Sequence, residues 1–224
     1  MFTINFGVRQ GSVLLPVLFA IYIDDVCTCS KFYRHSYVIL YADDILLLAP
    51  SVTILDTSCE LELTYLDMAV NSKKSCCLRV EPRCDKHCKN ICTSGGRLIP
   101  WVDEMRYLGL FIVQSRTFKC SLDHAKRSVY RVVNGIFGRI GRMASEEVIL
   151  ELIKTKCLPI LLYGLEVCPL SKTNLRSPDF PINRFIIKLF NTNYVQTTTK
   201  CQSIFDFRLP SVIIIFRIGA KHFE

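Results

Sequence analysis

Two adjacent aspartates between two short apolar runs limit the possible folds of this chain most strongly. Asp43 and Asp44 follow the apolar run 37–41 and precede the apolar run 45–49, with only Ala42 beside them in the break. Two such runs, divided by a short break, predict a β-hairpin with the acids at its tip. Two like charges about 4 Å apart repel by about 4 kcal/mol at an effective dielectric near 20. The pair is therefore either a plain Asp-rich turn open to solvent or a site for hard divalent cations such as Mg²⁺.

The charge of the chain is unevenly distributed. Residues 1–112 carry 11 Lys and Arg against 12 Asp and Glu, whereas residues 113–224 carry 17 against 8. A basic half beside a nearly neutral half indicates that the second half binds a polyanion, and scattered surface lysines are the alternative. The hydrophobic fraction of 50% is high enough to bury a core, which excludes a wholly disordered chain.

The cysteines and the apolar runs indicate an intracellular protein. The twelve cysteines are irregularly spaced, which favours reduced thiols over a disulfide scaffold. The longest apolar run, residues 13–23, is too short to cross a bilayer, which needs about 20 residues. Pro16 within this run and the acids Asp24 and Asp25 after it are unlike a signal peptide. We expect neither secretion nor a transmembrane segment.

Hydrophobic periodicity predicts an α+β chain in two parts. In residues 1–113 we expect helices starting at Ser12 and Ser51 and strands over 75–80, 98–102 and 106–113, which with the hairpin form a small, mostly antiparallel sheet. The apolar stripe of the helix from Ser12 is expected to face the core. In residues 114–224 only helices are predicted, starting at Ser121 and Ser145, over 177–190 and near Pro210, with an interruption at Pro159.

Four motifs in order resemble the palm of reverse transcriptases. Tyr41-Ala42-Asp43-Asp44 resembles their catalytic hairpin, and residues 7–19 are similar to the preceding palm motif, with Leu15 where the family usually has Ser. Residues 71–74 resemble the next motif, and Tyr107-Leu108-Gly109 resembles the primer-grip strand. The stretches 161–166 and 209–211 are similar to segments of LINE-type (non-LTR), jockey-like retrotransposon enzymes.

This resemblance implies an RNA-directed DNA polymerase, which is a nucleotidyltransferase that uses two Mg²⁺ ions, an RNA template, a DNA primer and deoxynucleoside triphosphates. It implies a partial palm at 1–113 and a basic, thumb-like helical region at 114–224. Asp43 would bind both metal ions and Asp44 would support them, while Lys74, or Lys73 in its place, would protonate the pyrophosphate; an ordinary helix-end lysine is the alternative. The remaining roles would be nucleotide and template binding by Arg9, Gln10, Gly11 and Tyr41, the primer grip by Tyr107, Leu108 and Gly109, and phosphate contacts by Lys126, Arg127, Arg131 and Arg139.

One departure from the family bears on activity. The family carries its fingers and its first metal-binding aspartate upstream of the Gly7 motif, and Met1 stands six residues before Gly7. We therefore expect a fragment that is inactive by itself. A non-catalytic nucleic-acid-binding remnant is the alternative function, and an intron-type reverse transcriptase is disfavoured by the Tyr163 and Pro210 stretches.

The sequence leaves the oligomeric state, the copied RNA and a zinc site undecided. Cys84, Cys88 and Cys92 surround His87, but all four lie within nine residues. Because structural zinc sites usually combine two separate pairs of ligands, free thiols are favoured here.

Overall fold

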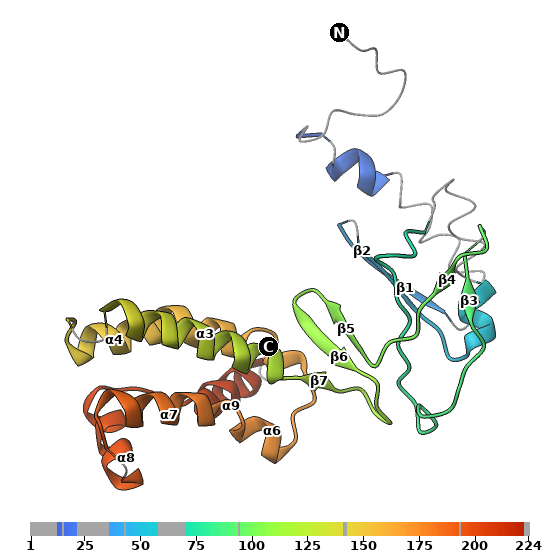
Figure 1. The fold of residues 1–224 in the computed structure, drawn as a ribbon. Helices are drawn as coiled ribbons and strands as arrows, with labels where there is room; N and C mark the ends of the chain where they lie inside the picture. Colours follow the sequence, from blue (N-terminus) through green and yellow to red (C-terminus); the bar gives the residue numbers. More distant parts are fainter. Residues whose placement is uncertain are drawn as a thin grey trace. The chain divides into compact units, whose positions relative to one another are not determined.

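The structure is a computed structural model that describes residues 13–14, 16–21, 36–42, 44–57, 70–93, 95–140, 143–192 and 194–221. The chain divides into two units, which are named here by their position in the sequence (Figure 1). The N-terminal unit contains residues 1–79 and 85–102, and the C-terminal unit contains residues 80–84 and 103–224. The described elements of the whole chain are helices and small antiparallel sheets, so the fold is mixed α and β.

The predicted acidic hairpin is present in the N-terminal unit. Strand β1 (Tyr37–Tyr41) pairs antiparallel with β2 (Asp44–Leu48), and Tyr41 stands opposite Asp44. Side chains alternate along β1, with Val38 and Leu40 half-buried between more exposed neighbours, as a strand with one covered face requires. Asp44 is therefore the first residue of β2, one position earlier than the sequence indicates.

A small core lies elsewhere in the N-terminal unit. Strand β3 (Ile91–Cys92) pairs with β4 (Leu98–Ile99), and the helical turn 52–57 starts where the Ser51 Oγ accepts a hydrogen bond from the Ile54 N–H at 3.3 Å. Three residues are buried there, with partly buried neighbours around them: Cys77, Ile91 and Ile99, surrounded by Val52, Leu55, Val70 and Trp101.

Two predictions for the N-terminal half are wrong. Residues 75–80 form no regular strand, because this segment pairs only through single bridges, from Cys77 to Trp101 and from Val80 to Ser115. Residues 16–21 are helical, but their apolar stripe is not a core face: Leu14 is 64% exposed and Ile21 is 65% exposed. No described element covers this stripe, so helical periodicity identified the apolar face without identifying what packs on it.

A second hairpin begins the C-terminal unit. Strands β5 (Glu104–Tyr107), β6 (Leu110–Val113) and β7 (Cys120–Ser121) form a three-stranded antiparallel sheet in the order β5-β6-β7. The predicted single strand 106–113 is therefore wrong. It folds back at Leu108 and Gly109, whose φ angles of 46° and 84° are both left-handed, as a two-residue type I′ turn requires.

Helices make up the rest of the C-terminal unit (Figure 1). The helix from Ser145 is interrupted near Pro159, as predicted: α4 ends at Leu152, a π-helical segment follows, and Pro159 lies in the first turn of the next α-helix, where its missing N–H is tolerated. The elements are α3 (Asp123–Ile140), α4 (Glu146–Leu152), η2 (Ile153–Cys157), α5 (Leu158–Leu162), η3 (Leu165–Val167), α6 (Lys172–Arg176), α7 (Asp179–Leu189), α8 (Val195–Ile204) and α9 (Pro210–Lys221). No described helix is both long enough and apolar enough to span a bilayer.

These helices enclose the larger core. Val129 and Val133 of α3 are buried against Leu161 of α5, Ile182 of α7 and residues of the neighbouring helices. The Asp179 carboxylate accepts a hydrogen bond from the Ser211 N–H at 2.9 Å, which joins the start of α9 to the start of α7. Residues 103–224 belong to the C-terminal unit, so the hairpin β5-β6 groups with the helices, whereas the boundary expected from the sequence lies after residue 113.

Candidate functional site

The tip of the β1-β2 hairpin presents one acid of the predicted pair. Asp43 lies outside the described residues, as do Arg9, Gln10 and Gly11. Tyr41 and Asp44 face each other across the strand pair and both are exposed, with Tyr41 at 60%. Ala42 beside them has a φ of 52°, a left-handed conformation that costs a residue with a side chain about 1–2 kcal/mol. Strand pairing on both sides holds this strained tip in place.

The chemistry of this tip fits a divalent cation. Among the described residues, no lysine or arginine forms an ion pair with Asp44, so its carboxylate oxygens are available to a ligand. Carboxylate oxygens are the ligands that Mg²⁺ prefers. Nowhere in the described parts of the chain do three or more His, Cys, Asp or Glu residues gather closely enough to hold a metal ion. Asp44, together with its sequence neighbour Asp43, is thus the donor set that this hairpin offers.

Lys73 and Lys74 lie on a hydrogen-bonded turn in the same unit. The backbone N–H of Lys74 donates to the Asn71 carbonyl at 2.9 Å, and that of Lys73 donates to the Asn71 Oδ1 at 3.1 Å. Both side chains are exposed, and neither joins Asp44 through an ion pair or hydrogen bond in the described structure. The asparagine thus shapes the turn and leaves both ammonium groups in solvent.

The residues predicted as a primer grip form the tip of the β5-β6 hairpin. Tyr107 ends β5 and its hydroxyl is buried without a hydrogen-bond partner among the described residues. Leu108 and Gly109 form the turn, and the Leu108 carbonyl accepts a hydrogen bond from the Tyr163 hydroxyl at 2.9 Å. No local pattern in the sequence indicates a site role for Tyr163, although the stretch 161–166 is part of the resemblance to retrotransposon enzymes.

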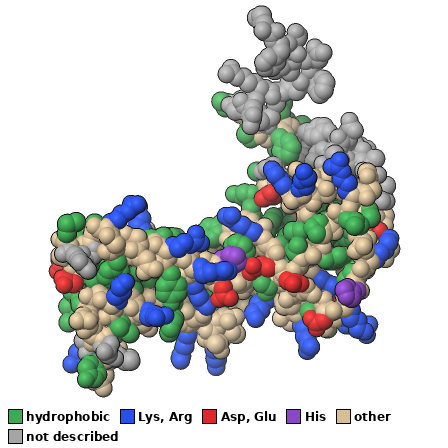
Figure 2. Space-filling view, in the orientation of Figure 1, with side chains coloured by type: hydrophobic (Ala, Val, Ile, Leu, Met, Phe, Trp, Pro, Cys, Tyr) green, Lys and Arg blue, Asp and Glu red, His purple; other side chains and the backbone are tan. Residues whose placement is uncertain are grey.

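The four predicted phosphate contacts lie on α3 with unequal freedom. Arg127, Arg131 and Arg139 are exposed and fall within about 120° of the helix circumference at 100° per residue. Lys126 is half-buried, and its ammonium pairs with the Asp123 carboxylate at 3.4 Å. Figure 2 shows Lys and Arg side chains spread over the visible face of the helical region. The Arg127 Nε donates to the Asp123 carbonyl at 3.3 Å, so Arg131 and Arg139 are the two best placed to meet a polyanion.

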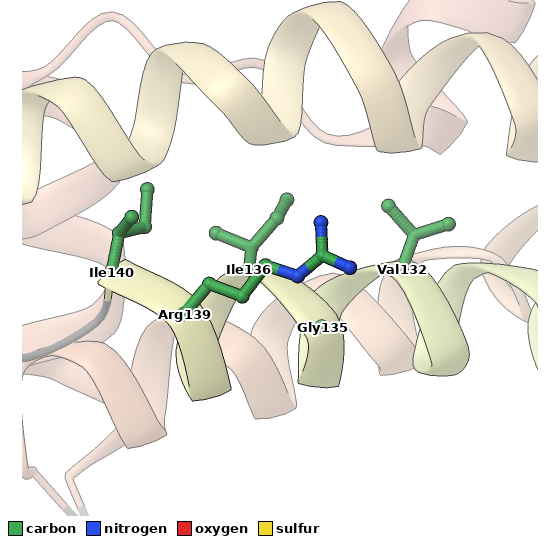
Figure 3. Close-up of a pocket in the computed structure, with 5 residues that line it drawn as sticks. All are labelled: Val132, Gly135, Ile136, Arg139 and Ile140. Carbon is green, nitrogen blue, oxygen red and sulfur yellow. The ribbon is translucent and has the colours of Figure 1, made fainter.

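A shallow cavity of about 370 Å³ runs along the same helix. Val132, Gly135, Ile136, Arg139 and Ile140 line it (Figure 3). The aliphatic side chains point toward the neighbouring helix, and the Arg139 side chain extends along α3 past Ile136 (Figure 3). Because this lining holds a single charged group among apolar ones, the cavity lacks the converging polar groups that a nucleotide site needs.

The cysteine cluster shows no arrangement of metal ligands among the described residues. Cys84 is buried, whereas Cys88 is half-buried and its Sγ lies 2.8 Å from the Arg79 guanidinium. A guanidinium beside a thiol sulfur occupies space that a metal ion would need and repels a cation. None of the nine cysteines that the structure describes forms a disulfide.

Two buried thiols of the C-terminal unit are poor nucleophiles. Burial raises the pKa of Cys157 to about 11. Burial is also the main cause that raises the pKa of Cys168 to about 12. A hydrogen bond with Cys120 and the negative charges of Cys120 and Glu166 add to this rise. Since an unperturbed thiol has a pKa near 9, both stay protonated at neutral pH, and their contribution to stability is lost only as the pH rises above about 9. These two cysteines are buried and unreactive at neutral pH.

Comparison with known proteins identifies the first half of the chain. Residues 2–112 match the family described as reverse transcriptase (RNA-dependent DNA polymerase). These residues belong to that family. All the motif residues from Arg9 to Gly109 lie inside the reverse transcriptase match, whereas the four basic residues of α3 lie outside it. The predicted family is thus confirmed for the part of the chain that carries the acidic hairpin.

Two mobile-element proteins are similar over more of the chain. The RNA-directed DNA polymerase from mobile element jockey of Drosophila funebris is 26% identical over 181 residues, which cover 73% of this chain and 19% of that protein. The retrovirus-related Pol polyprotein from type-1 retrotransposable element R2 of Popillia japonica is 27% identical over 214 residues, which cover 87% of this chain and 29% of that protein. The chain therefore spans less than a third of either relative. No solved structure matches it.

Proposed function

We propose that this chain is part of an RNA-directed DNA polymerase of a non-LTR, jockey-like retrotransposon. The observation that carries the proposal is the acidic hairpin: the reverse transcriptase match includes Asp43 and Asp44, and β1 and β2 form the paired strands on either side of residues 42 and 43. Both relatives are proteins of mobile elements. The reaction would join a deoxynucleotide to the 3′ end of a DNA primer on an RNA template.

The residues of the N-terminal half then have distinct tasks. Asp43 and Asp44 would hold two Mg²⁺ ions, which when bound lower the pKa of the primer hydroxyl and neutralise charge on the leaving pyrophosphate. Lys74, exposed on its turn, would donate a proton to that pyrophosphate. Arg9, Gln10 and Gly11 would bind the nucleotide and template, and Tyr41, exposed beside Asp44, would pack near the primer end.

The C-terminal unit would bind the template–primer duplex. We propose that the β5-β6 tip contacts the primer backbone and that the helices act as a thumb-like region. The exposed arginines of α3 support this assignment, because a cationic side chain must be accessible from solvent to contact a phosphate. Contacts of this kind position the duplex and do not read its sequence.

Primer extension tests the proposed activity. The chain would be assayed alone and joined at its N-terminus to the preceding segment of the jockey relative, with an RNA template, a DNA primer, deoxynucleotides and Mg²⁺. We expect incorporation by the extended chain and none by the chain alone. Absence of incorporation by an extended chain that is folded and binds the duplex would contradict the proposal.

The salt dependence of duplex binding tests the thumb-like role. If Lys126, Arg127, Arg131 and Arg139 each neutralise one phosphate, their summed slope of log K against log salt is about −3.6, at about −0.9 per contact. Replacing Arg131 or Arg139 with Ala should make the slope shallower by about 0.9, whereas replacing Lys126, which pairs with Asp123, should change it less. Fluorescence anisotropy with a labelled RNA–DNA hybrid measures this. A wild-type slope near zero would remove the thumb-like assignment.

A non-catalytic nucleic-acid-binding remnant is the second candidate. The excess of 17 basic over 8 acidic residues in the second half favours it, because this charge supports binding without any chemistry. Under this function the arginine substitutions would weaken binding as above, and the extended chain would incorporate no nucleotide.

A further inference from the structure

We propose that Tyr163 and Gly164 are positioning residues that hold the tip of the β5-β6 hairpin in the conformation needed to contact the primer. The inference rests on the proposed function of that hairpin, because it assigns residues that act through the Leu108–Gly109 turn. Neither residue is expected to touch the reacting groups.

A hydrogen bond joins the two segments at the turn itself. The Tyr163 hydroxyl donates to the Leu108 carbonyl at 2.9 Å, across 55 positions of sequence. Leu108 has a left-handed φ of 46°, which a bulky side chain rarely adopts. A carbonyl in such a turn changes direction if the backbone relaxes to an ordinary conformation. The hydrogen bond therefore favours the strained conformation over the relaxed one.

The ring of Tyr163 also occupies the space beside Gly109. A Cβ atom built on Gly109 would lie 2.9 Å from the Tyr163 Cε1 and 3.6 Å from its Cζ. Contacts under 3.0 Å are not tolerated by real Cβ atoms, and the φ of 84° at Gly109 is itself unfavourable for other residues. Glycine at this position thus allows the aromatic ring to lie directly against the turn.

Gly164 makes the reciprocal fit. Its φ of 66° turns the chain after α5, and a Cβ atom there would lie 2.8 Å from the Leu110 Cδ2 and 3.0 Å from its Cδ1. Leu110 is the first residue of β6, directly after the turn. Two glycines, one on each segment, therefore face the side chain of the other segment.

The surroundings of Tyr163 show that its ring is not a core element. Leu161, Leu162 and Leu165 are at most 3% exposed, whereas Tyr163 itself is 59% exposed. The buried leucines anchor the backbone of residues 161–165 in the helical core, and the tyrosine projects from this anchor to the hairpin. A tyrosine that contributed only packing would be buried, so its exposed contact with the turn indicates a positioning role.

The opposite end of the hairpin has a separate attachment. The His124 Nε2 lies 2.8 Å from the Glu104 Oε2, and its ring stacks on Phe111 at a centroid distance of 3.5 Å. Glu104 pairs with Val113 at the end of the hairpin away from the turn. This attachment provides a matched control, because Glu104→Ala removes a side-chain contact of the same hairpin without altering its tip.

The test compares two RNA–DNA hybrids in the full chain, one with a recessed DNA 3′ end and one with blunt ends. We expect the wild-type chain to bind the recessed end more tightly than the blunt hybrid. Tyr163→Phe, which removes only the hydroxyl, should reduce this preference about fivefold, the net effect of one hydrogen bond, while affinity for the blunt hybrid stays the same and circular dichroism shows that the variant remains folded. Glu104→Ala should leave the preference unchanged.

A second pair of variants gives the reciprocal contact its own test. Gly164→Ala should reduce the preference about tenfold or more, and adding Leu110→Ala should recover part of it, because the displaced atoms belong to the Leu110 side chain. Retained preference in both Tyr163→Phe and Gly164→Ala would overturn the positioning role. A wild-type chain that binds both hybrids equally would instead overturn the proposed primer contact of the hairpin. Anisotropy titrations give both affinities.

Discussion

Replacing Asp43 with Asn should lower the rate of primer extension by the extended chain about a thousandfold or more. The asparagine keeps the size of the side chain but removes the charge that would hold two Mg²⁺ ions. Metal ions contribute several kcal/mol to stabilising the transition state, and each 1.4 kcal/mol corresponds to a tenfold change in rate. The tip is already built on paired strands, with Tyr41 opposite Asp44, so the neutral variant should retain the hairpin.

The controls for this substitution separate chemistry from binding. Asp43→Asn should leave affinity for the RNA–DNA hybrid unchanged or slightly tighter, because it removes a negative charge near phosphates. Asp44→Asn should reduce the rate less, in keeping with a supporting role, and Glu147→Gln on the exposed face of α4 should not change it. Single-turnover extension and anisotropy on the same preparations measure the rate and the affinity. An Asp43→Asn variant within tenfold of the parent would contradict the metal-binding role.

Replacing Ile182 with Ala should destabilise the C-terminal unit by about 2–5 kcal/mol, the usual cost of emptying a well-packed aliphatic site. Ile182 lies on α7 and has no exposed surface. It belongs to a cluster with Val129 of α3 and Leu161 of α5. Because the cluster joins these helices, they cannot close the space left by the lost atoms without moving together. Small domains are stable by only about 5–15 kcal/mol, so the loss is a large fraction of the total.

Denaturant unfolding followed by circular dichroism measures this change. Val148→Ala on α4 is the matched control, since its side chain is 50% exposed and its truncation should cost less than about 0.5 kcal/mol. We expect the unfolding midpoint to fall strongly for Ile182→Ala and to stay near the parent value for Val148→Ala. Equal effects of the two substitutions would show that this cluster is not the core that holds the helices together.

Local patterns in the sequence predicted the elements that local physics controls. The hairpin of β1 and β2 was predictable because two apolar runs flank the acids, and the starts of α7 and α9 were predictable from Pro178 and Pro210, which favour the first turn of a helix. The helix α3 was also predictable, because a helix is expected to start at Ser121 and α3 begins at Asp123. The match of residues 2–112 to the reverse transcriptase family confirmed the family predicted from the four palm motifs.

Other features depend on contacts between distant parts of the chain. Residues 106–113 have the composition of one strand, yet they form a hairpin because Leu108 and Gly109 adopt positive φ angles beside the ring of Tyr163. The segment 75–80 has strand composition but only single bridges, because it meets Trp101 and Ser115 at separate points. Composition describes what a residue favours alone, and these positions are decided by neighbours that lie far away in sequence.

By itself, the sequence therefore determined the family, the acidic hairpin and the basic helical half, because motifs, alternation and charge are properties of neighbouring residues. Only the tertiary structure decided that the second hairpin belongs with the helices and that Tyr163 reaches the Leu108 carbonyl. The physical reason is steric. The left-handed turn at Leu108 and Gly109 and the glycine at 164 are required only because the two segments pack closely against each other.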